Sequence, residues 1–237
     1  MKRSLLVPLV AGALALSLSP SWAGEAQPLT SCNQEVEGNV YLTGVLDFSA
    51  DQWGVNLRRR GTIELRGFAI RNAPFMAIQC HRSCEVVGPG TIEGNGMGIW
   101  APYRLKVTDV DLVGNSSLGI GSGKLKMIGT SVDGSQVGVH AGLRATLKDS
   151  SVTGSDWVGI DVAATIPFGS GPCTRGKLDL FNSIVEGNGF DWLSEYCAEH
   201  PCGDLVTCYE PQLDETSTCG SSRRNESSTS WGVCTFD

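Results

Sequence analysis

The chain has 237 residues, of which 41% are hydrophobic and 18% charged, and its 25 acidic against 18 basic side chains give a formal net charge of −7 at pH 7. This length suffices for one sizeable domain with its own hydrophobic core. The acidic balance argues against nucleic acid as a partner, because nucleic-acid-binding domains usually carry a basic surface.

Residues 1–23 have the composition of a secretory signal peptide. Lys2 and Arg3 precede the apolar run LLVPLVAGALALSL, and the sequence SWA at residues 21–23 offers a cleavage site between small residues. Removal of this segment leaves 16 basic and 25 acidic residues, a net charge of −9. No later stretch reaches the roughly 18 apolar residues of a membrane span. We therefore expect a secreted or periplasmic protein without a membrane span.

A repeat of 20 to 23 residues runs through residues 40–190, and residues 24–39 are expected to cap its N-terminal end. Glycines mark the repeat at intervals of 20 residues, and one interval of 33 residues contains an insertion of 13. These glycines are Gly94, Gly114, Gly134, Gly154 and Gly187. Each is followed by Asn or Ser, and a second glycine before Ile or Val comes four or five residues after most of them. Continued upstream, the pattern predicts about seven coils.

Each unit is predicted to form short strands. Apolar and polar residues alternate, as in Leu105-Lys106-Val107 and Leu125-Lys126-Met127, and this two-residue period is typical of a strand with one buried face. Helical spacing is absent, and the repeated glycines would interrupt helices. Short strands joined by Gly, Asn and Ser corners at a fixed repeat predict an all-β solenoid in which each coil packs on the next.

The repeated phrase (V/I)xG(N/S)…G(I/V) resembles the parallel β-helix repeats of the pectin-lyase-like superfamily over residues 38–190. The resemblance implies a single-stranded, right-handed parallel β-helix. The superfamily includes polysaccharide lyases, hydrolases, epimerases, carbohydrate-binding periplasmic proteins, adhesins and phage tailspikes. The fold therefore does not fix the function.

Stacked coils place equivalent residues above one another at about 4.8 Å per coil, so the sequence predicts columns of side chains. The first outward column is predicted to contain Asn56, Gln79, Trp100, Gly121, His140 and Asp161. The second outward column is predicted to contain Arg58, His81, Pro102, Gly123, Gly142 and Ala163. The inward positions between them are small or apolar, as a core requires: Leu57, Cys80, Ala101, Ser122, Ala141 and Val162.

The first outward column is suited to binding a sugar. Trp100 offers an aromatic platform, and the glycines at 121 and 123 are expected to leave a dip between Trp100 and His140, two coils or roughly 10 Å apart. A sugar ring is expected to stack there while polar groups hold its hydroxyls. The predicted substrate-binding residues are Trp100, Gln79, Asn56, Arg58 and His81.

His140 and Asp161 are the candidates for acid–base catalysis. They lie on adjacent coils, where a carboxylate is able to orient an imidazole that titrates near neutral pH. The alternative is an ordinary solvated column, with Trp100 lying beneath the insertion or the tail.

The superfamily's catalytic sets are not reproduced in this chain. Its pectate lyases use clustered calcium-binding aspartates with an arginine base, and its hydrolases use aspartates in close array, whereas Asp161 is alone on its face. This departure disfavours hydrolysis. A lyase or epimerase would depend on His140 with Arg58 or His81, and Arg58 is four coils from His140.

Asp109, Asp149 and Asn182 share a corner column that Gly129 interrupts, which favours turn stabilisation over metal binding. No metal or cofactor is therefore expected.

Charge is distributed unevenly along the predicted axis. Residues 51–83 carry six arginines and two acids, a local excess of +4, whereas residues 185–237 carry ten acids and two arginines, a local excess of −8. Arginine binds carboxylates bidentately, so the basic first coils are expected to bind uronate groups of an acidic glycan. The alternatives are a solvated arginine surface, or attraction to the acidic end of another molecule.

The nine cysteines are typical of an oxidising compartment, and their odd number leaves at least one thiol free, paired between chains or reactive. Cys80 and Cys84, in CHRSC, lack the order of a haem attachment and the four ligands of a closed zinc site, so a structural or disulfide role is expected. The insertion AATIPFGSGPCTRG either walls a groove or is stapled through Cys173 to the tail. Residues 191–237, with five cysteines, are expected to form a C-terminal cap.

Two functions of different class follow. The first is a secreted or periplasmic β-helix that binds a polysaccharide along the face with Trp100 and His140, with or without modifying it. The second is a non-catalytic, adhesin-like rod that presents a rigid surface to a protein of the cell envelope.

Overall fold

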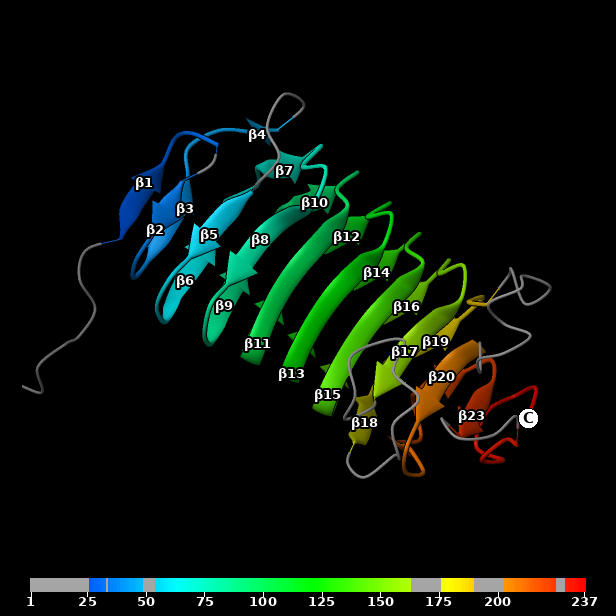
Figure 1. Ribbon diagram of the computed structural model, residues 1–237. Helices are drawn as coiled ribbons and strands as arrows, with labels where there is room; N and C mark the ends of the chain where they lie inside the picture. The colour runs from blue at the N-terminus through cyan, green and yellow to red at the C-terminus, as the bar shows by residue number, and fades with distance from the viewer. Residues whose placement is uncertain (1–25, 33, 49–53, 163–175, 190–202, 225–228) are drawn as a thin grey trace, which may run out of the picture.

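The computed structural model describes residues 26–32, 34–48, 54–162, 176–189, 203–224 and 229–237. In these ranges the chain forms an all-β parallel solenoid of about eight turns and contains no helix. Figure 1 shows the coils stacked into a rod, with β1 near one end and β23 near the other. The fold class expected from the repeat is confirmed, with about one coil more than the seven predicted.

Each coil has three arms, and every arm pairs in parallel with the same arm of the next coil. The first arm contains β2 (Glu35–Val36), β5 (Val55–Leu57), β8 (Met76–Cys80), the first halves of β11 (Met97–Thr108), β13 (Leu118–Ile128) and β15 (Val137–Lys148), β17 (Val158–Val162), β20 (Gly203–Thr207) and β23 (Ser222–Arg224). The second arm contains β1 (Gln27–Leu29), β3 (Val40–Leu42), β6 (Gly61–Glu64), β9 (Cys84–Val87), the second halves of β11, β13 and β15, β18 (Lys177–Phe181) and β21 (Gln212–Leu213).

The third arm is a separate sheet on the other side of the core. Its strands are β4 (Leu46–Asp47), β7 (Ala69–Arg71), β10 (Thr91–Glu93), β12 (Asp111–Val113), β14 (Ser131–Asp133), β16 (Ser151–Thr153), β19 (Ile184–Glu186) and β22 (Thr218–Cys219).

The core is a set of aliphatic columns that run along the axis. On the first arm one column has every side chain fully buried, and its members are Val55, Ile78, Ile99, Ile120, Val139, Ile160 and Leu205. Each such side chain contributes about 1.5–3 kcal/mol by burial, so the repeated aliphatic positions hold the coils together.

The two glycines of the repeat phrase are required for two different structural reasons. The first glycine, as at Gly94 (φ 63°), turns the corner into the first arm with a left-handed backbone, and the polar residue after it is buried. Asn115 in that position donates from Nδ2 to the carbonyl of Ile92 at 2.9 Å. The second glycine lies against the next coil, because a Cβ at Gly98 would come within 2.4 Å of the Gly119 carbonyl oxygen.

The corner between the second and third arms also has a left-handed backbone. Asp109, Asp149 and Asn182 all have positive φ, and Asn182 donates from Nδ2 to Oδ1 of Asp149 at 2.7 Å. The carboxylate of Asp109 lies over Gly129, where a Cβ would come within 2.3 Å of its Oδ1. These contacts support the turn-stabilising role expected for the column.

A β-bulge separates the first and second arms within the long strands. The register of β11 against β13 shifts between Ala101 and Arg104, so that two residues oppose Gly123. One of the two, Tyr103, is 63% exposed. The bulge therefore bends the strand around the core and projects an aromatic ring at the bend.

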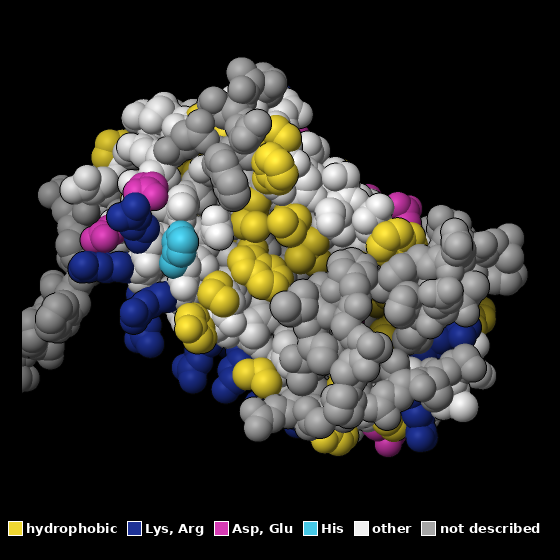
Figure 2. All heavy atoms as spheres, viewed as in Figure 1, with side chains coloured by type: hydrophobic (Ala, Val, Ile, Leu, Met, Phe, Trp, Pro, Cys, Tyr) yellow, Lys and Arg dark blue, Asp and Glu magenta, His cyan; other side chains and the backbone are white. Residues whose placement is uncertain are grey.

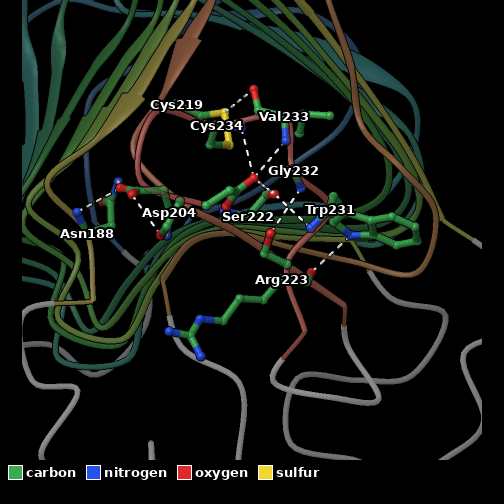
Figure 3. The surroundings of a disulfide bond; sticks show 12 residues. Asn188, Asp204, Cys219, Ser222, Arg223, Trp231, Gly232, Val233 and Cys234 are labelled. Carbon is green, nitrogen blue, oxygen red and sulfur yellow. Dashed lines mark hydrogen bonds between the residues drawn. A yellow bond between two sulfur atoms is a disulfide. The ribbon is translucent and has the colours of Figure 1, made fainter.

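Disulfides brace a corner and the C-terminal end. Cys80 and Cys84 are bonded, as a structural role for CHRSC predicts. Cys219 is bonded to Cys234, which holds residues 229–237 beside β22 and β23 (Figure 3). The insertion with Cys173 lies outside the described residues.

The coils continue beyond residue 190, where the repeat phrase ends. Strand β20 pairs with β17, β21 with β18, and β22 with β19. Part of the cysteine-rich segment is therefore the eighth coil. Within the described ranges, no helix has the length and apolar character that crossing a membrane requires.

Candidate functional site

The first outward column predicted from the sequence is present with the predicted register. Strand pairing joins its members in order from coil to coil, and we call them the tryptophan column: Asn56, Gln79, Trp100, Gly121, His140 and Asp161. All lie on the first arm, and the residues predicted to point inward beside them are buried. The second glycine of the repeat phrase aligns coils of unequal length, and this makes the register predictable.

The indole ring of Trp100 occupies the place where a dip was predicted. A Cβ at Gly121 would lie 2.3 Å from Cε3 and 2.5 Å from Cζ3 of Trp100, and 2.8 Å from Cδ2 of Leu118. The six-membered part of the ring therefore lies over Gly121. The prediction of a sugar-sized hollow between Trp100 and His140 is wrong, because the side chain that was to line the hollow fills it. Trp100 itself is half-buried.

His140 and Asp161 form the predicted pair. Nδ1 of His140 lies 2.8 Å from Oδ2 of Asp161, a distance at which the N–H donates to the carboxylate. Their side chains are only 4% and 14% exposed. The pair is oriented as an acid–base dyad would be, but its burial keeps a polymer on the surface from reaching the imidazole, so a catalytic role stays a prediction.

The other residues predicted to bind substrate differ in how exposed they are and in whether they already have a partner. Gln79 and Asn56 are half-buried; Gln79 lies beside Trp100 in the tryptophan column, and Asn56 lies one coil further along. His81 is exposed at the corner after β8. Arg58 is exposed and forms an ion pair with Glu35 at 2.5 Å, so its guanidinium is already partnered. Ala163, predicted for the second column, lies outside the described residues.

Apolar side chains surround the tryptophan column. Phe75, which precedes β8, and Tyr103, in the bulge of β11, are both more than half exposed. Figure 2 shows hydrophobic side chains gathered in the middle of the face that carries β8, β11 and β13. This face offers aromatic contact area to a ligand.

Most of the arginines in the basic first coils are paired with acids. Arg58 pairs with Glu35, Arg59 with Glu37, Arg66 with Glu64, and Arg71 with Asp47 and Glu93. Only Arg60 and Arg82 of the six form no ion pair with a described residue. The segment that was expected to bind uronates therefore offers little free positive charge.

Positive charge is concentrated on the second arm, where counting charges along the chain did not reveal it. One outward column carries a cation in five of six coils, and we call it the basic column: Arg60, Ser83, Arg104, Lys124, Arg144 and Lys177. Its signal in the sequence is the spacing of 20 between residues 104, 124 and 144. Arg144 and Lys177 are the members that share an acidic partner, Asp179.

An open groove of about 510 Å³ runs beside the basic column. Its charged lining residues are Arg60, Glu85, Arg104, Lys106, Lys124 and Lys126. Glu85 is the only acid among the lining residues, and it is paired with Lys106 at 2.6 Å. The groove therefore has an excess of four positive charges.

In the described part of the chain, no group of three or more His, Cys, Asp or Glu side chains is arranged to bind a metal ion. The fold defines the class of the protein as a parallel β-solenoid. No protein-family model, curated protein or solved structure matches this chain. The resemblance to the pectin-lyase-like superfamily therefore stays a prediction from the repeat.

Proposed function

We propose that this protein is a secreted or periplasmic β-helix protein of the pectin-lyase-like type, and that it binds a polysaccharide along the first arm. The observation that carries the proposal is the position of Trp100, whose ring lies over Gly121 in the middle of a face formed by rigid, register-locked strands. An indole laid along a sheet presents its outer surface to the apolar face of a sugar ring, at little cost in side-chain entropy.

The neighbours of Trp100 supply the other contacts that a glycan needs. Gln79 and Asn56 follow it along the tryptophan column. The amide of Gln79 is able both to donate to and to accept from sugar hydroxyls, whereas Oδ1 of Asn56 is buried. Tyr103 at the bulge adds a second exposed ring. Because successive coils repeat along the axis, a linear chain of sugars is the ligand shape that suits this face.

The burial of His140 supports binding in preference to catalysis. A general base has to reach the proton that it removes, and the imidazole is 4% exposed and already bonded to Asp161. Secretion is supported by the disulfides, which persist in oxidising compartments. The second candidate, an adhesin-like rod that binds an envelope protein, is favoured by the exposed apolar side chains of Phe75 and Tyr103.

Affinity electrophoresis of the mature, oxidised protein through gels that contain neutral or acidic polysaccharides tests the proposal. The wild type is expected to be retarded, and in the gel with a neutral polysaccharide Trp100→Ala is expected to migrate as in a gel without polysaccharide. Phe236→Ala is the matched control, because Phe236 is 81% exposed at the C-terminal end and its loss should leave retardation unchanged. Full retardation of Trp100→Ala in the neutral gel would refute the proposal, and migration of the wild type unaffected by every polysaccharide would favour the rod.

A further inference from the structure

We propose that the groove beside the basic column is a binding site for an acidic polysaccharide that lies along the solenoid axis. This inference rests on the proposed function, because it assigns the chemical class of the glycan and adds a second contact surface. The site lies on the second arm, around the bend from Trp100.

The first argument is the register of the charges. Arg104 on β11, Lys124 on β13 and Arg144 on β15 are direct partners in adjacent strands, and Lys177 on β18 continues the row. Adjacent strands lie about 4.8 Å apart, so cations follow one another along the axis at that interval. A linear polymer with an anion on successive units matches such a row better than a compact anion does.

The second argument is that the positive charges of the basic column have no acidic partners among the described residues where they line the groove. Like charges directly opposite one another on neighbouring strands destabilise a sheet. Arg104 and Lys124, with Lys126 beside them, form no ion pair with any described residue, whereas Arg144 and Lys177 share Asp179. The fold therefore tolerates a repulsion that a bound polyanion would relieve.

The third argument is the lining of the groove. Asn39, Thr62 and Ser83 add uncharged polar groups at one end, whereas Leu105 and Leu125, between the cations in sequence, are buried in the core beneath them. A uronate or sulfated sugar has the complementary groups, which are hydroxyls for the polar side chains and one anion for the cations. Tyr103 immediately precedes Arg104, so a glycan in the groove is able to extend around the bend onto the first arm.

Nucleic acid suits the site less well. A duplex carries one negative charge per about 1.7 Å, so its field acts on the whole protein, which has a net charge of −7. A glycan with one anion per sugar has a much lower charge density, and contacts within the groove outweigh the repulsion from distant acids.

The experiment compares two gels whose polymers share one backbone, carboxymethyl cellulose and the uncharged hydroxyethyl cellulose. The groove variant is Lys124→Glu/Lys126→Glu. The control is Arg59→Glu/Lys148→Glu, which changes the net charge equally at two exposed residues that do not line the groove. Thermal unfolding of each variant reports whether the fold is intact.

The expected result is that only the groove variant loses affinity for carboxymethyl cellulose, by about tenfold or more, and that salt weakens wild-type binding. Full retardation of the groove variant, or an equal loss in the control, would overturn the inference. Equal competition by a single-stranded oligonucleotide would overturn the assignment to a polysaccharide. The failure of one proposal is distinguishable from the failure of the other, because Trp100→Ala tests the first arm in the uncharged gel and the groove variant tests the second arm in the acidic gel.

Discussion

The indole ring of Trp100 lies over Gly121 of the next coil, in the space that any larger side chain at position 121 would require. The substitution Gly121→Ala would therefore force the ring to move, and overpacking of this kind costs about 1–3 kcal/mol. We expect a loss of that size in urea-induced unfolding, together with weaker retardation by polysaccharide. Gly44→Ala is the matched control, because a Cβ at Gly44 meets nothing within 4 Å. Equal retardation of the wild type and Gly121→Ala would mean that the ring's position does not matter.

The bond between His140 and Asp161 is expected to be structural. Asp161→Ala leaves the buried Nδ1–H of His140 without its partner, which typically costs about 1–3 kcal/mol. In a double-mutant cycle with His140→Ala, unfolding free energies should show that the two residues are coupled. Additive effects in the cycle would show that the contact contributes nothing. Glycan retardation by folded His140→Ala should persist, and its complete loss would place the imidazole in the binding site.

The repulsion within the basic column predicts that one substitution stabilises the folded protein. Lys124→Glu places an acid between Arg104 and Arg144, and exchanging a like-charge neighbour for an opposite one is worth about 0.2–1 kcal/mol per pair in a sheet. The midpoint of urea unfolding should therefore rise at low salt, and the gain should shrink as salt is added. A lower midpoint at low salt would contradict the view that the column is electrostatically strained.

The C-terminal end is expected to lose stability at low pH. Burial acts to raise the pKa of Asp237, but hydrogen bonds from the Ser222 hydroxyl and from the backbone amides of Cys234, Ser222 and Val233 outweigh it and lower the pKa. A carboxyl group whose pKa is lower in the folded state contributes stability above its unfolded pKa, near 3.8, and this contribution is lost as the pH falls through the folded value. Asp237→Asn should remove that part of the pH dependence, measured by proteolysis of the C-terminal segment between pH 7 and about pH 2. An identical acid profile in the variant would contradict this assignment.

The disulfide between Cys219 and Cys234 closes a sequence separation of 15 residues. Loop-closure entropy predicts that the double variant Cys219→Ser/Cys234→Ser loses about 3 kcal/mol in unfolding free energy. The double variant avoids leaving one thiol available for exchange with other cysteines. Unchanged stability would indicate that hydrogen bonds such as those of Asp237 suffice to hold this end.

The repeat made the register of the first arm predictable, because the glycine phrase marks the same point of each coil and so determines which residues are neighbours without any knowledge of packing. The eighth coil was missed because Asp204 stands where Gly159 stands in the preceding coil, so the glycine phrase is broken. The orientation of the Trp100 ring was not predictable, since an empty place at Gly121 is compatible with either a hollow or a neighbour's side chain. The burial of His140 likewise depends on tertiary packing that an outward position in a column does not specify.

The basic column illustrates a different reason for a missed site. Counting charge along the chain drew attention to the six arginines of residues 51–83, four of which are paired with acids, three of them with acids of a neighbouring coil, as Arg58 is with Glu35. Counting by column instead shows that residues 104, 124 and 144 lie in a row. In a solenoid the physical neighbours of a charge are one coil away, so electrostatic reasoning needs the register first.

Oxidative footprinting of Trp100 tests the central claim most directly. The mature protein is exposed briefly to hydroxyl radicals with and without the polysaccharide that retards it, and modification of each tryptophan is measured by mass spectrometry. Trp231, at the C-terminal end, is the internal reference. We predict that the polysaccharide slows oxidation of Trp100 severalfold and leaves Trp231 unchanged; equal rates at Trp100 with and without the polysaccharide would contradict glycan binding on the first arm.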